Sequence, residues 1–505
     1  MKTISDSGPR RLAALISAAT FALFVGGCAV GPDYRAPAAP QADGYVRGGL
    51  PAHTAGVAIP GGAAQRFVSA RDLPGDWWTL FGSPELNALI ARALEHNPTL
   101  AGAQAALRQA DENLAAGRGS YFPAASGSIG AMRERSSGAA FGSSRPLIYT
   151  LNSASVNVSY TLDAFGGIRR QVEALRAQAE YRRFSLEAAY LSLTANIVTA
   201  AVTEASLRAQ IDATQRIADA QRTELDIIKR RVAAGGASRA DLLQQQSALA
   251  GTLATLPALE NALAQERNLL ATYTGSLPED FNAGDFDLDS LHLPRDLPVS
   301  LPSKLVAQRP DVRAYAALLH EATAQVGVAT SNMLPQLTLS GSAGGQAARF
   351  ADLFSPTAAV WSLAASVTQP LFRGGQLLHQ RRAAIAAAQE AAANYKATVL
   401  TAFANVSDTL LALQADARSV AAQAAAAAAA DESLQLVQSQ YANGAAAYPQ
   451  VLLAEEAKQS ASVALVKARA QRFADTAALF QALGGGWWHR TDTNPQSNDC
   501  CKGHL

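Results

Sequence analysis

A perfect two-residue alternation sets the strongest constraint on the fold of this chain. In residues 153–163, SASVNVSYTLD, the even-numbered positions hold Ala, Val, Tyr or Leu and the odd-numbered positions hold Ser, Asn, Thr or Asp. A period of two is typical of a β-strand with one apolar and one polar face. A tilted strand needs about 9–11 residues to cross the hydrocarbon core of a bilayer. The stretch therefore predicts a strand long enough to span a membrane, with its small polar side chains toward water.

Three other segments predict similar strands. Residues 359–368 alternate in the same way, with Trp361, Leu363 and Val367 on one side. A third strand is expected around Leu337 and Leu339, and a weaker fourth after residue 123. The alternative is a pair of half-buried hairpins in a soluble α+β domain.

The requirements of backbone hydrogen bonding extend this prediction to several chains. After residue 28 the sequence has no uninterrupted run of 18 apolar residues, so a membrane-spanning helix is not expected. Strands in lipid must close into a barrel, because open edges leave backbone groups unpaired. The smallest membrane barrels have about eight strands, so four strands from one chain require copies to share a barrel.

The N-terminus predicts export and lipid attachment. Lys2, Arg10 and Arg11 precede an apolar run over residues 12–25, which ends at Gly26, Gly27 and Cys28. That order is typical of a secretory signal peptide. It resembles a bacterial lipoprotein signal, in which the cysteine thiol is acylated, and implies acylation of Cys28 by fatty acids such as palmitate. The alternative is a buried structural cysteine. The residue after Cys28 is Ala rather than Asp, which in the lipoprotein class implies transfer to the outer membrane.

Charge and cysteine usage exclude other classes. The chain has 42 basic and 41 acidic residues, so it lacks the basic excess of a nucleic-acid-binding protein. Cys500 and Cys501 lie with His489 and His504 in a polar tail that has no zinc-ligand spacing, and a frayed tail is the favoured interpretation. His96 has no second histidine at metal spacing, and there is neither a phosphate-binding Gly-rich loop with Lys nor a GxSxG turn. We expect no enzymatic activity, no cofactor and no metal.

The chain also repeats itself. HNPTL (96–100) aligns with QRPDV (308–312), SYFP with NMLP, YTLDAFGG (160–167) with VTQPLFRG (367–374), and AAGGASRADLL with ANGAAAYPQVL. The four landmarks keep their order at offsets of 212, 212, 207 and 209 residues, measured at Pro98, Pro123, Phe165 and Gly235. Each half is expected to contain a short helix, two strands, a long helix, a Gly-rich turn and a further helix.

Long helices are predicted between these landmarks. Residues 167–232 contain no proline, and apolar residues recur there in alternating steps of three and four. This 3.5-residue period is typical of helices packed knobs-into-holes. About 66 helical residues would extend for ~100 Å. Residues 374–448 offer a second proline-free helix, and shorter helices before residue 123 and over residues 238–273 would lie beside the long ones.

These features divide the chain into six segments. They are a signal peptide (1–27), a lipid-anchored extended segment (28–75), a first repeat (76–285), a linker (286–302), a second repeat (303–486) and a polar tail (487–505).

In combination, four stretches resemble the TolC-like outer-membrane efflux proteins, in the lipoprotein branch that serves resistance-nodulation-division pumps. They are GCAVGPDYRAP, DWWTLFGSPELNALIARALEHNPTL, LPSKLVAQRPDVRAYAALLHEATAQVGVATSNMLPQLTLSG and SVTQPLFRGG. The resemblance, over about residues 25–488, implies a mixed α and β fold: a homotrimeric outer-membrane barrel of twelve strands, four per chain, continued by a periplasmic helical barrel. It also implies a periplasmic adaptor and an inner-membrane transporter as partners.

The two Gly-rich turns are the expected functional tips. Glycine permits the tight or left-handed backbone that reverses a helix. The resemblance implies that the adaptor docks there, on Ala234, Gly235, Gly236, Ser238, Asn443 and Gly444.

The resemblance also implies a gate near these tips. It places a closed-state hydrogen bond between Asp241 and Tyr441, while the Arg that some members carry is replaced here by Ala446. Family members often carry a carboxylate at the positions of Gln450 and Leu453, so an acidic selectivity ring is in doubt, and an apolar block by Leu453 is expected instead.

These expectations define the function and its alternatives. The expected function is a passive outer-membrane exit duct for drugs or toxic small molecules. The same architecture also fits the exit duct of a type I protein secretion system. A third alternative is a non-transporting helical lipoprotein of the periplasm.

Overall fold

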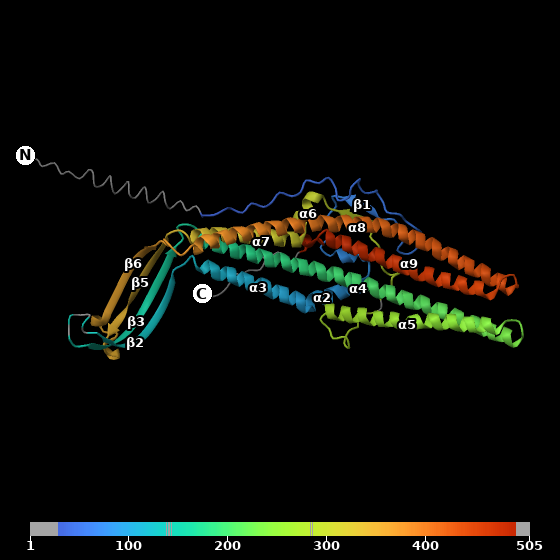
Figure 1. Ribbon diagram of the computed structural model, residues 1–505, viewed down its shortest axis with the longest axis horizontal. Coiled ribbons are helices and arrows are strands. Elements are labelled where there is room, and N and C mark those ends of the chain that lie inside the picture. Colours follow the sequence, from blue (N-terminus) through green and yellow to red (C-terminus); the bar gives the residue numbers. More distant parts are fainter. Residues whose placement is uncertain are drawn as a thin grey trace, which may run out of the picture. The chain divides into compact units, whose positions relative to one another are not determined.

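The computed structural model describes residues 29–490 except residues 138, 140, 141, 143, 283 and 285. The signal peptide, Cys28, and the Cys500, Cys501 and His504 tail lie outside the described residues. The described chain divides into two compact units. Figure 1 labels the helices and strands that compose them. Among the described residues, the strand unit comprises 29–37, Leu107–Arg182 and Tyr315–Tyr395, and the hairpin unit comprises Ala38–Ala106, Arg183–Ala314 and 396–490.

A four-stranded antiparallel sheet forms most of the strand unit. Its strands are β2 (Ala124–Ser136), β3 (Leu147–Leu162), β5 (Gln336–Ala347) and β6 (Ala359–Thr368), in the order β2-β3-β5-β6. Two short 3₁₀ helices, η3 (Phe350–Asp352) and η4 (Pro356–Ala358), lie in the connection from β5 to β6. All four predicted strands are present. β6 has the predicted bounds, and β3 begins six residues before the perfect alternation.

The register of the sheet separates two faces. Val156 lies opposite Ala343, which lies opposite Trp361, and this apolar face includes large exposed side chains. Leu363 and Trp361 on it are 80% and 81% exposed. The polar face carries serine pairs across neighbouring strands, with Oγ–Oγ distances of 3.0 Å for Ser128–Ser155 and 2.8 Å for Ser342–Ser362. The alternation in the sequence thus becomes two chemically different surfaces.

The helices have the predicted lengths. They include α3 (Pro98–Gly119), α4 (Gly167–Ala233) and α5 (Arg239–Tyr273) in the first half, and α7 (Pro310–Ser331), α8 (Gln376–Ala442) and α9 (Tyr448–Ala482) in the second. Corresponding helices have equal lengths of 22, 67 and 35 residues. α4 and α8 contribute residues to both units.

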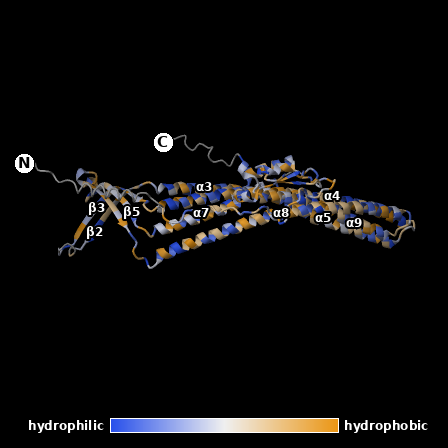
Figure 2. Cartoon of the chain, turned by 90° about the horizontal axis from the view of Figure 1, so that it is seen from above, coloured by the Kyte–Doolittle hydropathy of each residue, from blue (hydrophilic) through white to orange (hydrophobic). Residues whose placement is uncertain are grey.

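An aromatic core fixes one end of the helices in the hairpin unit. In addition to α9, this unit contains two shorter helices, α2 (Pro84–His96) and α6 (Pro302–Gln308), and the 3₁₀ helix η1 (Trp77–Phe81). Trp77 and Phe480 are buried with their ring centroids 5.6 Å apart, and Phe81 and Phe473 pack beside them. Figure 2 shows hydrophobic residues along the helices and the strands.

The hairpin unit also contains structure that the sequence did not predict. β1 (Arg66–Ser69) pairs in parallel with β4 (Asp296–Val299), within segments expected to be an extended tether and a linker. The 3₁₀ helix η5 (Trp487–His489) lies at the start of the expected polar tail, where Trp487 Nε1 donates to Gln308 O at 2.6 Å. Strands of four residues show too little alternation to be recognised from sequence.

One helix meets the length and composition of a membrane span. Among the described residues, α4 contains an 18-residue window of mean hydropathy 1.2, and 56% of that window is buried. A core helix of a soluble bundle has the same properties, so this window is weak evidence for a helical span.

Candidate functional site

The first helix tip, between α4 and α5, is closed by glycine. Gly235 has φ +74°, in the left-handed region. Its N–H donates to Val232 O at 3.0 Å, and Gly236 N–H donates to Arg231 O at 2.7 Å. These two bonds form the Schellman arrangement that ends a helix. The turn therefore depends on the glycine that the sequence indicated.

A reciprocal cap begins α5 directly after this turn. Asp241 N–H donates to Ser238 Oγ at 3.1 Å, and Ser238 N–H donates to Asp241 Oδ2 at 3.0 Å. Such a capping box satisfies two backbone donors that the helix leaves unpaired. The Asp241 carboxylate thus has a structural role at the start of α5.

The second tip, between α8 and α9, repeats the first turn. Gly444 also has φ +74°, and Ala445 N–H donates to Gln440 O at 2.8 Å. Asn443 Nδ2 donates to Ser439 O at 2.8 Å, and Gln450 Oε1 accepts from Ala447 N–H at 3.2 Å. The residues expected to dock a partner are all exposed: Ala234, Gly235, Gly236, Ser238, Asn443 and Gly444.

The expected gate residues lie near these tips but are not paired as expected. In the part of the chain that the structure describes, Asp241 and Tyr441 form no hydrogen bond with each other. The Tyr441 ring instead lies 4.8 Å from the Arg231 guanidinium and 5.3 Å from the Tyr448 ring. Leu453 is 66% exposed on α9. The structure therefore places an apolar side chain in solvent at this position of α9.

A buried polar network lies below the tips, and the sequence did not predict it. Tyr448 Oη donates to Gln245 Oε1, whose Nε2 donates to Gln221 O at 3.0 Å. Gln221 Nε2 in turn lies 3.5 Å from Glu455 Oε2, a long contact. Tyr448 and Glu455 belong to α9, Gln245 belongs to α5 and Gln221 belongs to α4. The network ties both hairpins together beneath their turns.

Glu455 is an unusual carboxyl in this network. It is 6% exposed and lies beside a cavity of about 240 Å³ between α4, α8 and α9. Burial, and then the nearby Glu224 charge, raises the pKa of Glu455 to about 7. Burial likewise raises the pKa of Glu224. The neighbouring Glu456, by contrast, is exposed.

We expect Glu455→Gln to remove a pH-dependent cost of folding. The pKa rises from 4.5 to about 7 on folding. The folded chain therefore binds the proton more tightly, and its stability falls as pH rises through that range. The variant should gain about 3 kcal/mol over the wild type near pH ~8 and little near pH ~4.5. Melting temperatures at both pH values measure this, with the exposed Glu456→Gln as control; an equal gain at both would contradict it.

A sheet with one apolar and one polar exposed face, joined to long helical hairpins, defines the class: a mixed α and β channel protein of the outer membrane. The chain belongs to the outer membrane efflux protein family, whose model matches residues 89–276 and 301–485. The resemblance to the TolC-like outer-membrane efflux proteins is thereby confirmed.

Relatives of known role support this assignment. The pyoverdine export outer membrane protein OpmQ of Pseudomonas aeruginosa is 32% identical over 425 residues, which cover 81% of this chain and 87% of OpmQ. The antibiotic efflux pump outer membrane protein ArpC of Pseudomonas putida is 29% identical and covers 94% of this chain and 96% of its own length. The protein is accordingly an outer-membrane component of an efflux system.

Solved structures agree with the fold. The outer-membrane channel OprN matches with a TM-score of 0.82 at 27% identity, covering 91% of this chain and all of its own. The open state of the Neisseria gonorrhoeae channel MtrE matches with a TM-score of 0.78 at 26% identity, covering 92% of this chain and all of its own.

Proposed function

We propose that three copies of this chain form the exit duct of a tripartite efflux pump. Four strands from each copy make one twelve-stranded barrel in the outer membrane, and the helices form a tunnel in the periplasm. A periplasmic adaptor and an inner-membrane transporter deliver the cargo and supply the energy, so transport through the duct is passive.

The incomplete sheet is the observation that carries this proposal. β2 and β6 each pair with one neighbour among the described strands, so the sheet has two open edges. Its apolar face exposes Trp361, Leu363 and Val367. In lipid, an open edge costs several kcal/mol for each unpaired backbone group. Identical copies would pair β2 with β6 and close the barrel with the apolar face outward.

Small molecules are the proposed cargo. The polar face that would line the barrel carries mostly Ser, Asn and Thr, with Asn157 Nδ2 donating to Ser128 Oγ at 3.3 Å, and the charged Glu134 lies toward the outer end of β2. A wall made mainly of neutral hydroxyl and amide groups selects weakly by charge. The names of the relatives, which refer to pyoverdine export and antibiotic efflux, favour small-molecule export over type I protein secretion.

The described N-terminal segment supports a lipid anchor at Cys28. Val30 N–H donates to Phe165 O at 3.1 Å, where β3 passes into α4. The buried Arg170 side chain donates to Val30 O at 3.2 Å and to Asp33 Oδ1 at 2.6 Å. Tyr34 stacks on His320 with ring centroids 4.3 Å apart. These contacts fix the segment directly after Cys28 on the strand unit, so an acylated cysteine would tether that unit to the membrane.

The tips are the proposed docking and gating region. Their exposed turns offer backbone to an adaptor, and Leu453 would narrow the tunnel end by an apolar block. We expect Leu453→Ala to raise single-channel conductance in a planar bilayer, with the exposed Leu436→Ala as control. Asp241→Ala removes the α5 cap and should also favour opening. Small conductance that stays unchanged in both variants would contradict these gating roles.

The assembly itself can be measured directly. Native mass spectrometry of the purified full-length protein should give a trimer, and the protein should migrate differently on gels before and after heating. Its gene should restore drug resistance to a strain that lacks the outer-membrane component but retains its transporter and adaptor. A monomer that yields no ion current would contradict the proposal.

A further inference from the structure

We propose that the apolar face of the sheet carries a binding site for lipid A, a phosphorylated and multiply acylated lipid of the outer leaflet. The site lies at the strand ends that are remote from the helices. This inference rests on the proposed function, because only a sheet in the outer membrane meets this lipid.

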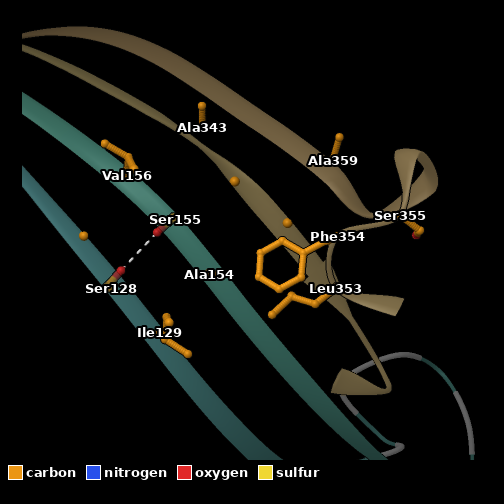
Figure 3. A pocket seen from close by; sticks show the side chains of 13 residues that line it. Ser128, Ile129, Ala154, Ser155, Val156, Ala343, Leu353, Phe354, Ser355 and Ala359 are labelled. Carbon is orange, nitrogen blue, oxygen red and sulfur yellow. Dashed lines mark hydrogen bonds between the residues drawn. The ribbon is translucent and has the colours of Figure 1, made fainter. Parts of the chain in front are cut away.

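A groove at these strand ends provides the apolar part of the site. It has a volume of about 760 Å³ and lies over β2, β3 and β5 beside the connection from β5 to β6 (Figure 3). Its lining includes Ile129, Ala154, Val156 and Ala343, which share the apolar face. A groove with such a lining accepts hydrocarbon, because apolar surface is removed from water on both sides of the contact.

The connection from β5 to β6 forms one wall of the groove. A Cβ on Gly345 would lie 2.1 Å from Leu353 O, so this glycine permits the connection to cross the face closely. Leu353 is buried against the sheet. The next residue, Phe354, is 80% exposed. Figure 3 shows its ring among the side chains that line the groove. An aromatic side chain held in this position offers a wide apolar contact for an acyl chain.

Two arginines on the same face provide the charged part. Arg133 and Arg135 continue the odd-numbered positions of β2 beyond Ile129, opposite Thr150 and Ile148. Both are exposed, and neither forms an ion pair among the described residues.

Nearby acidic groups do not neutralise these arginines. Glu134 belongs to the polar face and accepts a hydrogen bond from Tyr149 Oη at 2.8 Å. Asp352 is paired with Arg349 at 2.8 Å.

Along β2, the apolar lining of the groove is followed by the arginines, just as the acyl chains of lipid A are followed by its phosphorylated headgroup. At about 3.3 Å per residue, Arg133 lies ~13 Å beyond Ile129, toward the outer end of the strand. An acyl chain in the groove would therefore place a headgroup phosphate at the arginines, whose fork of donors suits phosphate oxygens. Lipid A carries two phosphates and several acyl chains in the leaflet at this level. A phospholipid has a single phosphate for the two arginines, so we expect it to bind more weakly than lipid A.

Native mass spectrometry of the purified trimer, titrated with bisphosphorylated lipid A, tests the site. We expect the double variant Arg133→Gln, Arg135→Gln to bind lipid A about tenfold more weakly, and Phe354→Ala to weaken it severalfold. The exposed Arg118→Gln, at the end of α3, is the matched control and should bind as the wild type does. Dephosphorylated lipid A and phosphatidylglycerol should each bind more weakly than lipid A.

Two outcomes would overturn the inference: equal lipid A binding by the double variant and the wild type, or phosphatidylglycerol binding as tight as that of lipid A. Failure of the proposed function is distinguishable, because the wild type would then give no trimer and no channel current. Trimers that conduct normally but bind lipid A independently of Arg133 and Arg135 would contradict the lipid site alone.

Discussion

Leu363→Arg is expected to abolish assembly of the channel, whereas Ser362→Arg is expected to leave it largely intact. Leu363 is 80% exposed on the apolar face, opposite Gly341. An arginine on the lipid face near the bilayer midplane costs about 2–4 kcal/mol per strand, and each trimer would contain three copies. Ser362 lies on the polar face, where it shares a 2.8 Å hydrogen bond with Ser342 Oγ. Losing that bond costs about 1 kcal/mol, and the new charge meets water.

This pair of variants measures the orientation of the sheet with a matched control. The readouts are the amount of heat-modifiable trimer in outer-membrane fractions and the drug resistance of a complemented strain. The result would be reversed if the polar face met lipid, because Ser362→Arg would then be the damaging change. Equal loss in both variants would indicate a barrel that does not distinguish the two faces.

Arg472→Ala is expected to destabilise the hairpin unit by about 3–4 kcal/mol, because it leaves buried acceptors without their donor. Arg472, on α9, is 0% exposed. Its guanidinium donates to Ala63 O at 2.7 Å, to Thr54 Oγ1 at 3.1 Å and to Gln65 Oε1 at 3.2 Å. One side chain thus holds residues 54–65 onto the helices.

The carboxyl group of Asp416 adds to the effect of replacing Arg472. Burial, and then the neighbouring Asp475, raises the pKa of Asp416 to about 7, and the charge of Arg472 opposes that rise. Without Arg472 the pKa of Asp416 should rise further. The double variant Arg472→Met, Asp416→Leu should recover part of the loss, because it replaces the buried guanidinium and the half-buried carboxyl with apolar groups.

Thermal unfolding in detergent and limited proteolysis measure these changes. In Arg472→Ala, residues 54–65 should become sensitive to protease at concentrations that leave the wild type intact. Lys467→Ala, an exposed position on the same helix, is the control. A melting temperature equal to that of the wild type would show that Arg472 does not hold residues 54–65 onto the helices.

Much of the fold was predictable because its signals are local. Alternation gave the four strands, and the absence of proline gave the two 67-residue helices. Gly235 and Gly444 marked both helix reversals, and each adopts the left-handed conformation that only glycine adopts freely. The site was less predictable: the bond expected between Asp241 and Tyr441 is absent from the described chain, since Asp241 caps α5 and Tyr441 packs on Arg231.

The sequence by itself determined the periodic elements, their turns and the chemical difference between the faces of the sheet, because each depends on residues a few positions apart. Only the tertiary structure decided the pairing of β1 with β4, the network from Tyr448 to Glu455 and the burial of Arg472. Each of these joins segments that are remote along the chain, with Arg66 and Asp296 separated by 230 residues. A buried polar group must find its partner wherever the packing of the helices brings one within reach, and no local pattern records that choice.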